Sequence, residues 1–311
     1  MSDERKLSRR GFVKGAGMAA ATPVQLEGVE HFDVKAGDVR LHCAAVGPRD
    51  GPLVVLMHGF PECWLAWRYQ LPALAAAGFR AVAPDLRGYG GSDKPRGAAA
   101  YRIDLLARDA AELIVALGHE RADLVGHDWG AHIAWHVAMW DPRRVRRLAI
   151  LNVPHPERMR RGLRTLRQLR KSWYMLFFQL PVLPEWFMSP RRLRRAFRYT
   201  PARRGAYDDA VIEAMVAAAG DRTAPINYYR AAARYRSPSW KPVAAETLVI
   251  WGERDQWLGA ELAEPDPRWV PRVRVERIAE ASHWVQADAP GRVNELLVSF
   301  LGTAEMDYPP R

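Results

Sequence analysis

The sequence contains three residues whose types and order fit a catalytic triad. Asp128 stands in the stretch Gly-His-Asp-Trp-Gly at 126–130, Asp255 ends the stretch Trp-Gly-Glu-Arg-Asp at 251–255, and His283 follows 28 residues later. Glycines two residues before and two residues after Asp128 suit a sharp turn from a strand into a helix. Such a turn lifts the carboxylate above a sheet, at a helix N-terminus that favours its ionised form. Aspartate is also a common helix N-cap, so the turn by itself does not establish a nucleophile.

The type of nucleophile restricts the reaction. The sequence contains no Gly-x-Ser-x-Gly pattern, which argues against a serine esterase. A carboxylate that attacks an ester or amide forms a mixed anhydride, whereas attack on an electrophilic saturated carbon forms an ordinary alkyl ester that water can hydrolyse. Asp128 therefore indicates epoxide opening or cleavage of a carbon–halogen bond. In the second step we expect His283 to deprotonate the water while Asp255 fixes the tautomer of its imidazole.

The elements that must position these residues alternate along the chain. Helical candidates lie at 102–117 and 130–140, and short apolar runs typical of buried strands lie at 54–57, 80–83, 123–125, 148–151 and 247–251. Continuous apolar strands that alternate with helices predict an α/β fold with a mostly parallel central sheet covered on both faces. Ligands bind at the carboxyl ends of such strands. Asp128 and Asp255 follow the runs at 123–125 and 247–251, and His283 follows a further predicted strand at 272–278.

The alternation stops between Pro154 and Pro242, where the sequence is helical, arginine-rich and aromatic. Spacings of three, four or seven residues predict one shared helix face for Met159, Leu163, Leu166, Trp173, Phe177 and Leu180. An insertion between two strands would form a helical cap over the strand ends. We therefore expect a core at 26–155 and 243–302, an inserted cap at 156–242 and a tail at 303–311.

Several motifs resemble those of the epoxide hydrolases with the α/β-hydrolase fold, over about residues 28–302. They are His-Gly-Phe-Pro at 58–61, Asp-Leu-Arg-Gly-Tyr-Gly-Gly-Ser-Asp-Lys-Pro at 85–95, Gly-His-Asp-Trp-Gly at 126–130, Asn-Tyr-Tyr-Arg at 227–230, Trp-Gly-Glu-Arg-Asp at 251–255 and His-Trp-Val-Gln at 283–286. The resemblance implies conversion of an epoxide and water to a vicinal diol, with Asp128 as nucleophile and Asp255 and His283 as the acid–histidine pair. It also implies two cap tyrosines that protonate the epoxide oxygen. Tyr229 fits the family's Asn-x-Tyr-Arg pattern closely, and Tyr174 fits the other tyrosine position less closely.

The loop after the strand at 53–57 is expected to complete the site. Its backbone N–H at Phe60 can pair with that of Trp129 as an oxyanion hole. The expected substrate pocket, for a small lipophilic epoxide, includes His58, Pro61, His155, Trp173 and Phe177. For His155 a satisfied polar position in the core is an equally open interpretation. Aromatic residues at 173–187 are more often part of a core than of a pocket, and in a cap over a site they can be both.

Two alternatives to an epoxide hydrolase stay open on the residues alone. A haloalkane dehalogenase uses N–H donors for the leaving halide, and Trp129 offers one, but Phe60 occupies the loop position where some dehalogenases have asparagine. An opening epoxide needs a proton instead, which a buried phenol can supply, so Tyr229 and Tyr174 favour the epoxide. The second alternative is a ligand-binding relative without turnover, which the complete triad disfavours.

The net charge of +11 comes from one segment of the chain. Between Arg158 and Arg204 there are 14 basic residues and one acid, Glu185. Such a segment usually forms a solvated face, and attraction of nucleic acid, anionic lipid or an acidic ligand is the alternative. No nucleic-acid-binding motif accompanies the segment, so we expect no nucleic-acid partner.

Other features of the sequence exclude further classes of protein. No apolar stretch approaches the ~18–20 residues of a membrane span. His132 and His136 have the i, i+4 spacing of a metal site but no acidic neighbour between them, so we expect neither a metal nor a cofactor. The oligomeric state does not follow from the sequence.

The first 25 residues differ in character from the rest. Ser-Arg-Arg-Gly-Phe-Val-Lys at 8–14 resembles a twin-arginine export signal, and a weakly apolar run of glycine and alanine follows it. A disordered basic extension and a start of translation at Met18 are the alternatives. If residues 1–25 act as a signal, we expect export by the twin-arginine route. Otherwise we expect a cytoplasmic protein.

Overall fold

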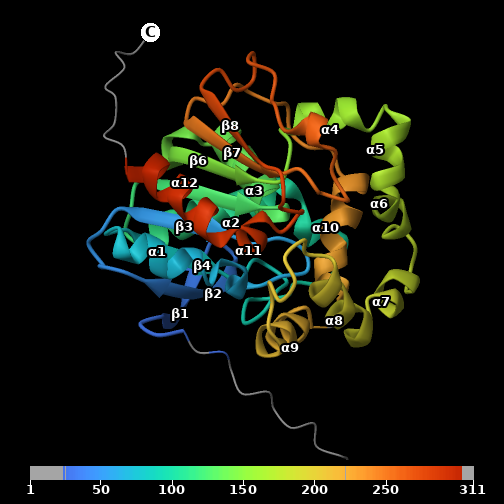
Figure 1. Ribbon diagram of the computed structural model, residues 1–311, viewed down its shortest axis with the longest axis horizontal. Helices are drawn as coiled ribbons and strands as arrows, with labels where there is room; N and C mark the ends of the chain where they lie inside the picture. The colour runs from blue at the N-terminus through green and yellow to red at the C-terminus, as the bar shows by residue number, and fades with distance from the viewer. Residues whose placement is uncertain (1–23, 25, 221, 303–311) are drawn as a thin grey trace, which may run out of the picture.

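An eight-stranded sheet lies at the centre of the molecule, in the order β1-β2-β4-β3-β5-β6-β7-β8 (Figure 1). The pairs β1–β2 and β2–β4 are antiparallel, and the other five pairs are parallel. The strands are β1 (Glu30–Ala36), β2 (Val39–Val46), β3 (Leu53–Met57), β4 (Arg80–Pro84), β5 (Ala122–His127), β6 (Val145–Leu151), β7 (Glu246–Gly252) and β8 (Val273–Ile278). The predicted α/β fold with a mostly parallel sheet is therefore confirmed.

The computed structural model describes Val24, residues 26–220 and residues 222–302. The predicted export signal at 8–14 and the predicted tail at 303–311 lie outside these described residues. No helix within the described ranges has the length and apolarity needed to cross a membrane.

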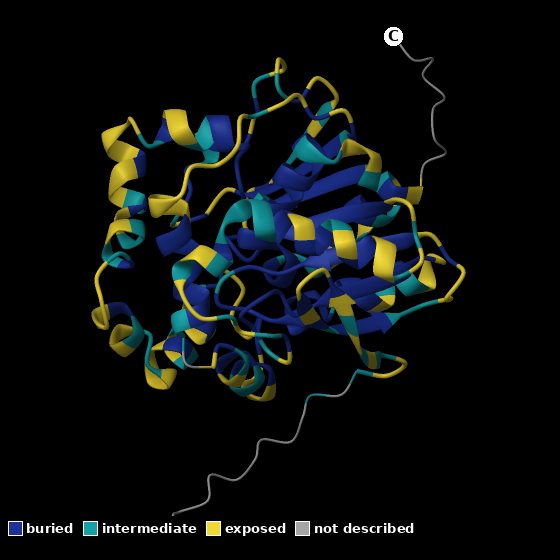
Figure 2. Ribbon diagram, turned by 180° about the vertical axis from the view of Figure 1, so that it is seen from behind, coloured by how far each residue is buried: buried dark blue, intermediate teal, exposed yellow. Residues whose placement is uncertain are grey.

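Helices cover both faces of the sheet because the strands send alternate apolar side chains to opposite sides. In β3, Val55 and Met57 join one hydrophobic core, and Val54 and Leu56 join the other. The first core is completed by α2 (Ile103–Ala116) and α3 (Trp129–Trp140), which match the predicted helices. The second is completed by α1 (Gln70–Ala76), α11 (Val285–Asp288) and α12 (Pro290–Gly302). Figure 2 shows the strands as the most continuously buried part of the fold.

The described residues between β6 and β7 form seven helices, and we refer to residues 156–242 as the cap. The helices are α4 (Pro156–Gly162), α5 (Leu166–Lys171), α6 (Trp173–Phe177), α7 (Leu183–Phe187), α8 (Pro190–Tyr199), α9 (Asp209–Ala218) and α10 (Thr223–Arg234). The expected common helix face from Met159 to Leu180 is wrong. The segment breaks into three helices of seven residues or fewer, with Thr165 capping the second, so the spacing does not stay on one face. Leu166, Trp173 and Leu180 are instead exposed.

Two glycines permit the sharp turn between β5 and α3. A Cβ on Gly126 would lie 2.5 Å from the Cα of Ala131, and one on Gly130 would lie 2.1 Å from the backbone oxygen of Met57. Both neighbours are backbone atoms that cannot rotate away. The glycines therefore allow α3 to pack directly against β3 and β5, which raises Asp128 above the end of the sheet.

We expect Gly130→Ala to lower the free energy of unfolding by at least about 1–3 kcal/mol, because the new methyl group overlaps the Met57 carbonyl. Urea unfolding followed by circular dichroism measures the change. The matched control is Gly291→Ala in α12, where a Cβ meets no atom within 4 Å. Equal stability of the two variants would contradict this account of the turn.

Candidate active site

Asp128 occupies the turn between β5 and α3 in a strained backbone conformation. Its φ angle is +49°, in the region that residues with a side chain rarely adopt. The backbone N–H of Phe60 donates a hydrogen bond of 2.7 Å to Asp128 Oδ1. A Cβ on Gly59 would lie 2.3 Å from the Cβ of Asp128, so only glycine lets the loop after β3 approach this closely. The strain and the close loop together fix the carboxylate in one position.

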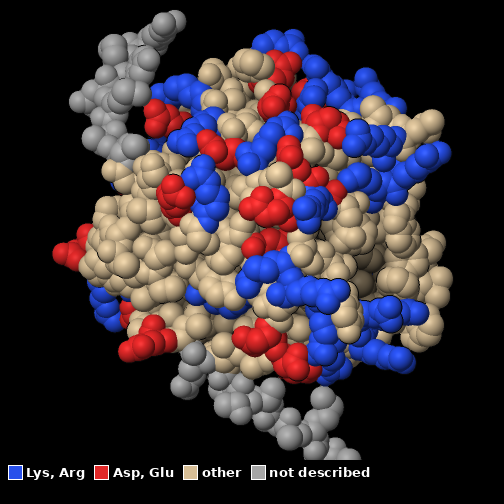
Figure 3. All heavy atoms as spheres, viewed as in Figure 1, with Lys and Arg blue, Asp and Glu red and all other residues tan. Residues whose placement is uncertain are grey.

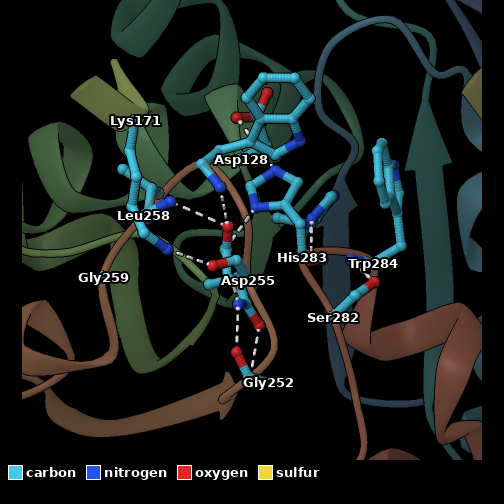
Figure 4. A network of polar contacts seen from close by, with 12 residues as sticks. Asp128, Lys171, Gly252, Asp255, Leu258, Gly259, Ser282, His283 and Trp284 are labelled. Atoms are coloured by element: carbon cyan, nitrogen blue, oxygen red, sulfur yellow. Dashed lines mark hydrogen bonds and ion pairs between the residues drawn. The ribbon is translucent and has the colours of Figure 1, made fainter. Parts of the chain in front are cut away.

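His283 lies between two carboxylates (Figure 4). Its Nδ1 donates to Oδ2 of Asp255 at 2.7 Å, and its Nε2 lies 3.5 Å from Oδ2 of Asp128. The Asp255 side chain is fully buried, and its Oδ1 accepts hydrogen bonds from the backbone N–H groups of Trp257 (2.7 Å) and Leu258 (2.9 Å). The bond to Asp255 keeps a proton on Nδ1 and turns Nε2 toward Asp128. The three residues that the sequence predicts as a triad are thus brought together.

The charges of this triad depend on one another. Burial by itself would lower the pKa of His283, but the negative charges of Asp255 and Asp128 outweigh burial and raise the pKa to about 10. Burial by itself would raise the pKa of Asp128 and of Asp255, but the His283 imidazolium keeps both below their ordinary value. At neutral pH the site therefore holds one imidazolium between two carboxylates.

Asn152 is a site residue that the sequence analysis missed. It follows β6 directly, with a φ angle of +51°, and its side-chain N–H donates to Asp255 Oδ2 at 2.9 Å. The same amide donates to the Gly252 carbonyl at 3.2 Å and accepts from the Gly252 N–H at 2.9 Å. Its position one residue after a predicted strand was the available signal, because the carboxylates predicted to be catalytic follow strands in the same way.

The cap also holds the loop that carries Asp255. Buried Gln168 of α5 donates to the Trp257 carbonyl at 2.9 Å and accepts from the Gly259 N–H at 3.0 Å. Lys171, at the end of α5, donates to the Asp255 carbonyl at 2.5 Å (Figure 4). The acid of the triad is therefore fixed from the core by Asn152 and from the cap by α5.

A second polar group, also missed from the sequence, lies behind His283. The imidazole of His127 has Nε2 at 2.9 Å from the His283 carbonyl and Nδ1 at 2.8 Å from a carboxylate oxygen of Glu62. The other Glu62 oxygen accepts from the hydroxyl of Tyr207, in the cap, at 2.8 Å. Glu62 and His127 are fully buried, and they anchor the main chain of His283.

The cavity above Asp128 has a volume of about 180 Å³ and an almost entirely apolar lining. Its polar or titratable members include Asp128, His283, Tyr174 and Tyr229. The predicted residues Phe60, Pro61, Trp173 and Phe177 also line it, together with Phe178, Phe187, Met188, Arg192, Leu193, Ala196, Thr200, Trp257 and Trp284.

His58 and His155 do not line this cavity, so their predicted place in the pocket is corrected. His58 is fully buried below the loop, with Nδ1 at 2.9 Å from the Gly59 carbonyl and Nε2 accepting the Leu86 N–H at 3.0 Å. His155 caps α4 by accepting the Glu157 N–H at 3.3 Å. Both imidazoles thus accept a hydrogen bond from a backbone N–H group.

Two tyrosines come from different cap helices and line the cavity with Asp128. Tyr229 lies on α10 and Tyr174 on α6, with their ring centroids 5.8 Å apart in an edge-to-face arrangement. The Trp129 indole packs edge-on against Tyr229 at 5.1 Å. Burial, and then the negative charge of Asp128, raises the pKa of both phenols above their ordinary value. Both hydroxyl groups therefore keep their protons at neutral pH.

This chain is similar to families and structures already known. Residues 52–290 match the family model described as alpha/beta hydrolase fold. AB hydrolase superfamily protein YfhM of Bacillus subtilis is 38% identical over 89% of this chain and 99% of the relative. Epoxide hydrolase 3 of Xenopus tropicalis is 38% identical over 87% of this chain and 77% of the relative.

Solved structures that are similar to this chain also include epoxide hydrolases. Epoxide Hydrolase A from Mycobacterium thermoresistibile has a TM-score of 0.76 at 30% identity, over 89% of this chain and 99% of that one. A mutant of the epoxide hydrolase from Bacillus megaterium, complexed with its product (R)-3-[1]naphthyloxy-propane-1,2-diol, has a TM-score of 0.78 at 31% identity, over 88% of this chain and 100% of that one.

Fold and site together define a cofactor-independent hydrolase of the α/β-hydrolase fold. Within that fold, the chain belongs to the epoxide hydrolase family.

We expect Asp128→Asn to lower the pKa of His283 from about 10 toward its ordinary value of 6.5, because one of the two opposing charges is lost while burial remains. The ring nitrogen shifts of His283, measured by NMR as a function of pH, report the change. The pKa of His283 is higher in the folded chain, at about 10, than in the unfolded chain, at about 6.5. Protonated His283 therefore stabilises the folded state fully below about pH 6.5, and this stabilisation is lost as the pH rises through about 10.

The control is Asp50→Asn, which removes one exposed carboxylate outside the cap. The pKa of His283 should not change in this variant. A His283 pKa that stays near 10 in Asp128→Asn would show that Asp128 does not set it.

Proposed function

We propose that this chain hydrolyses a lipophilic epoxide to a vicinal diol through a covalent ester on Asp128. The observation that carries this proposal is the shared cavity, where an ionised carboxylate lies among apolar side chains with two protonated phenols. A carboxylate attacks one carbon of the oxirane, and the phenols supply the proton that the opening oxygen needs.

In the first step an oxygen of Asp128 forms a bond to an oxirane carbon, and the carbon–oxygen bond of the ring breaks. Tyr229 or Tyr174 donates its proton to the departing oxygen, which becomes the first hydroxyl of the product. The raised pKa of each phenol means that it is still protonated when the oxygen develops negative charge. The apolar lining excludes competing water from this proton transfer.

The second step depends on the charge that the first step removes. Once Asp128 is esterified, Asp255 is the one carboxylate of the triad that still raises the pKa of His283 against the effect of burial. His283 therefore gives its proton to the tyrosinate, which becomes a phenol again. Neutral His283 then takes a proton from a water molecule, whose oxygen attacks the ester carbonyl of Asp128. The N–H of Phe60, already bonded to Asp128 Oδ1, stabilises the oxyanion with the N–H of Trp129. The bond between the carbonyl carbon and the ester oxygen then breaks, and the departing alkoxide takes the proton from His283 to become the second hydroxyl. The acid proton left on Asp128 passes to His283, so release of the diol restores both carboxylates and the imidazolium.

The lining of the cavity favours an aromatic or long aliphatic substituent on the epoxide. Trp173, Phe177, Phe178 and Trp257 offer ring faces and edges. The naphthyl ether diol of the Bacillus megaterium enzyme is a bulky aromatic product of the same type. An aryl glycidyl ether is accordingly a suitable first substrate.

With such an epoxide, His283→Gln should accumulate the ester, because attack by Asp128 needs no base whereas hydrolysis does. The ester should form more slowly than in the unmodified chain, since Asp128 loses the imidazolium that favours its ionised form. Intact-protein mass spectrometry is expected to show a gain equal to the mass of the epoxide, and peptide mapping should place it on Asp128. The double variant Asp128→Asn with His283→Gln is the control and should gain nothing. Unchanged turnover in His283→Gln without any adduct would reject the mechanism.

Tyr229→Phe should slow ring opening by about 10²–10⁴-fold, since general acid catalysis contributes roughly this factor. Stopped-flow measurement of the first step isolates the effect from hydrolysis. Tyr228→Phe is the matched control, because this neighbouring phenol donates to the Arg87 carbonyl at 2.6 Å and does not line the cavity. Equal rates of ring opening in the two variants would show that Tyr229 does not donate the proton. In a separate assay with haloalkanes, halide release without diol formation from epoxides would favour the dehalogenase alternative.

A further inference from the structure

The outer side of the cap exposes an unusual amount of apolar surface. Of the twelve large hydrophobic residues that are exposed in the described part of the chain, ten lie between Leu166 and Tyr199. We call this stretch, on α5 to α8, the cap surface, and its exposed members are Leu166, Leu169, Trp173, Leu176, Leu180, Val182, Leu183, Trp186, Phe187 and Tyr199. Leu176 is 75% exposed and Trp186 is 70% exposed. Figures 1 and 2 show these helices along one edge of the molecule. Apolar exposure gathered in this way marks an interaction site.

The same stretch is strongly cationic. It has eight basic residues and a single acid, Glu185, which is paired with Arg230 at 2.6 Å. Among the described residues, no carboxylate pairs with Arg170, Arg191 or Arg195. A hollow in α7 and α8 is lined by Trp186, Ser189, Arg191, Arg192, Arg194, Arg195, Arg198 and Tyr199. Figure 3 shows uncharged surface along this edge with lysine and arginine on either side of it.

The cap surface is continuous with the catalytic cavity. The rings of Trp173 and Phe177 lie 5.9 Å apart, and Phe177 and Phe187 lie 5.2 Å apart. The guanidinium of Arg192 then covers the Phe187 ring at 4.3 Å. All four residues also line the cavity above Asp128, so they join the inner lining to the exposed edge.

We propose that the cap surface binds the surface of an anionic lipid bilayer. Leucine and tryptophan side chains enter the boundary between headgroups and acyl chains, while the arginines bind lipid phosphates. The arginine–aromatic contacts, Arg192 on Phe187 and Arg195 on Tyr199 at 6.0 Å, suit this boundary because they keep the charge beside an apolar ring.

Two other occupants fit these residues less well. A second copy of the chain would bring two sets of unpaired arginines together, and nothing on the cap surface neutralises them. A nucleic acid would pair with the arginines but would leave the exposed leucines without an apolar partner. A bilayer with negative headgroups satisfies both the charge and the apolar side chains.

Binding at this surface would place the opening of the cavity against the lipid, where apolar epoxides concentrate. This consequence rests on the proposed function, whereas vesicle binding does not. The two are therefore tested separately: vesicle binding is measured without an epoxide, and turnover is measured with one.

The test is co-sedimentation of the full chain with vesicles of phosphatidylcholine alone and of phosphatidylcholine with phosphatidylglycerol. We expect binding to the anionic vesicles that is at least tenfold stronger and that weakens as salt is raised. The triple variant Arg170→Gln, Arg191→Gln and Arg195→Gln should lose at least about tenfold in affinity. Leu176→Ser with Trp186→Ser should also weaken binding, at every salt concentration.

The matched control removes three positive charges outside the cap, with Arg49→Gln, Arg108→Gln and Arg143→Gln. This control should bind the vesicles as the unmodified chain does. Equal binding to both kinds of vesicle, or full binding by the cap triple variant, would overturn the proposal. So would concentration-dependent self-association in analytical ultracentrifugation that Leu176→Ser with Trp186→Ser abolishes, since it would assign the cap surface to a second copy. Loss of epoxide turnover with intact vesicle binding would count against the proposed function alone.

Discussion

One imidazole shared by two buried carboxylates is the interaction on which the rest of the site depends. His283 donates to Asp255 at 2.7 Å and lies 3.5 Å from Asp128, and none of the three side chains is well exposed to solvent. Two carboxylates this close would repel one another in a medium of low polarity, where charges interact more strongly than in water. The imidazolium removes that repulsion. It keeps Asp128 ionised, as the proposed attack on an epoxide requires, although burial opposes the charge.

The surrounding structure serves to hold this arrangement at fixed distances. The core contributes the carboxyl ends of β5, β6 and β7, which place Asp128, Asn152 and the Asp255 loop side by side. The cap contributes Gln168 to the same loop. Because both halves of the protein bond to the Asp255 loop, a shift of the cap relative to the sheet would disturb the acid of the triad as well as the tyrosines. Cap position and triad geometry are thus mechanically connected.

Sequence alone predicted the parts of this structure that rest on local constraints. Short apolar runs predicted the buried strands. The turn at Asp128 was predictable because a Cβ on either flanking glycine, Gly126 or Gly130, would overlap backbone atoms. The short cap helices were not predictable from the spacing of apolar residues, since new helices begin within the segment, with Thr165 as the N-cap of α5. Of the two interpretations open for His155, the structure has the buried polar position, where it caps a helix. The sequence does not distinguish an imidazole that caps a helix from one that lines a pocket. Asn152 escaped notice because its role depends on Asp255, which lies 103 residues away.

The apolar cavity explains why the proposed chemistry divides into two steps. A buried site tolerates a change in net charge poorly, because each unpaired charge loses its hydration. Before ring opening, two carboxylates and one imidazolium give a net charge of −1. After esterification, Asp255 and a neutral imidazole give the same value, provided that the proton of His283 reaches the tyrosinate. The loss of charge on Asp128 thus makes His283 a base only once there is an ester to hydrolyse. A nucleophilic serine would not give this coupling, because it carries no charge to lose.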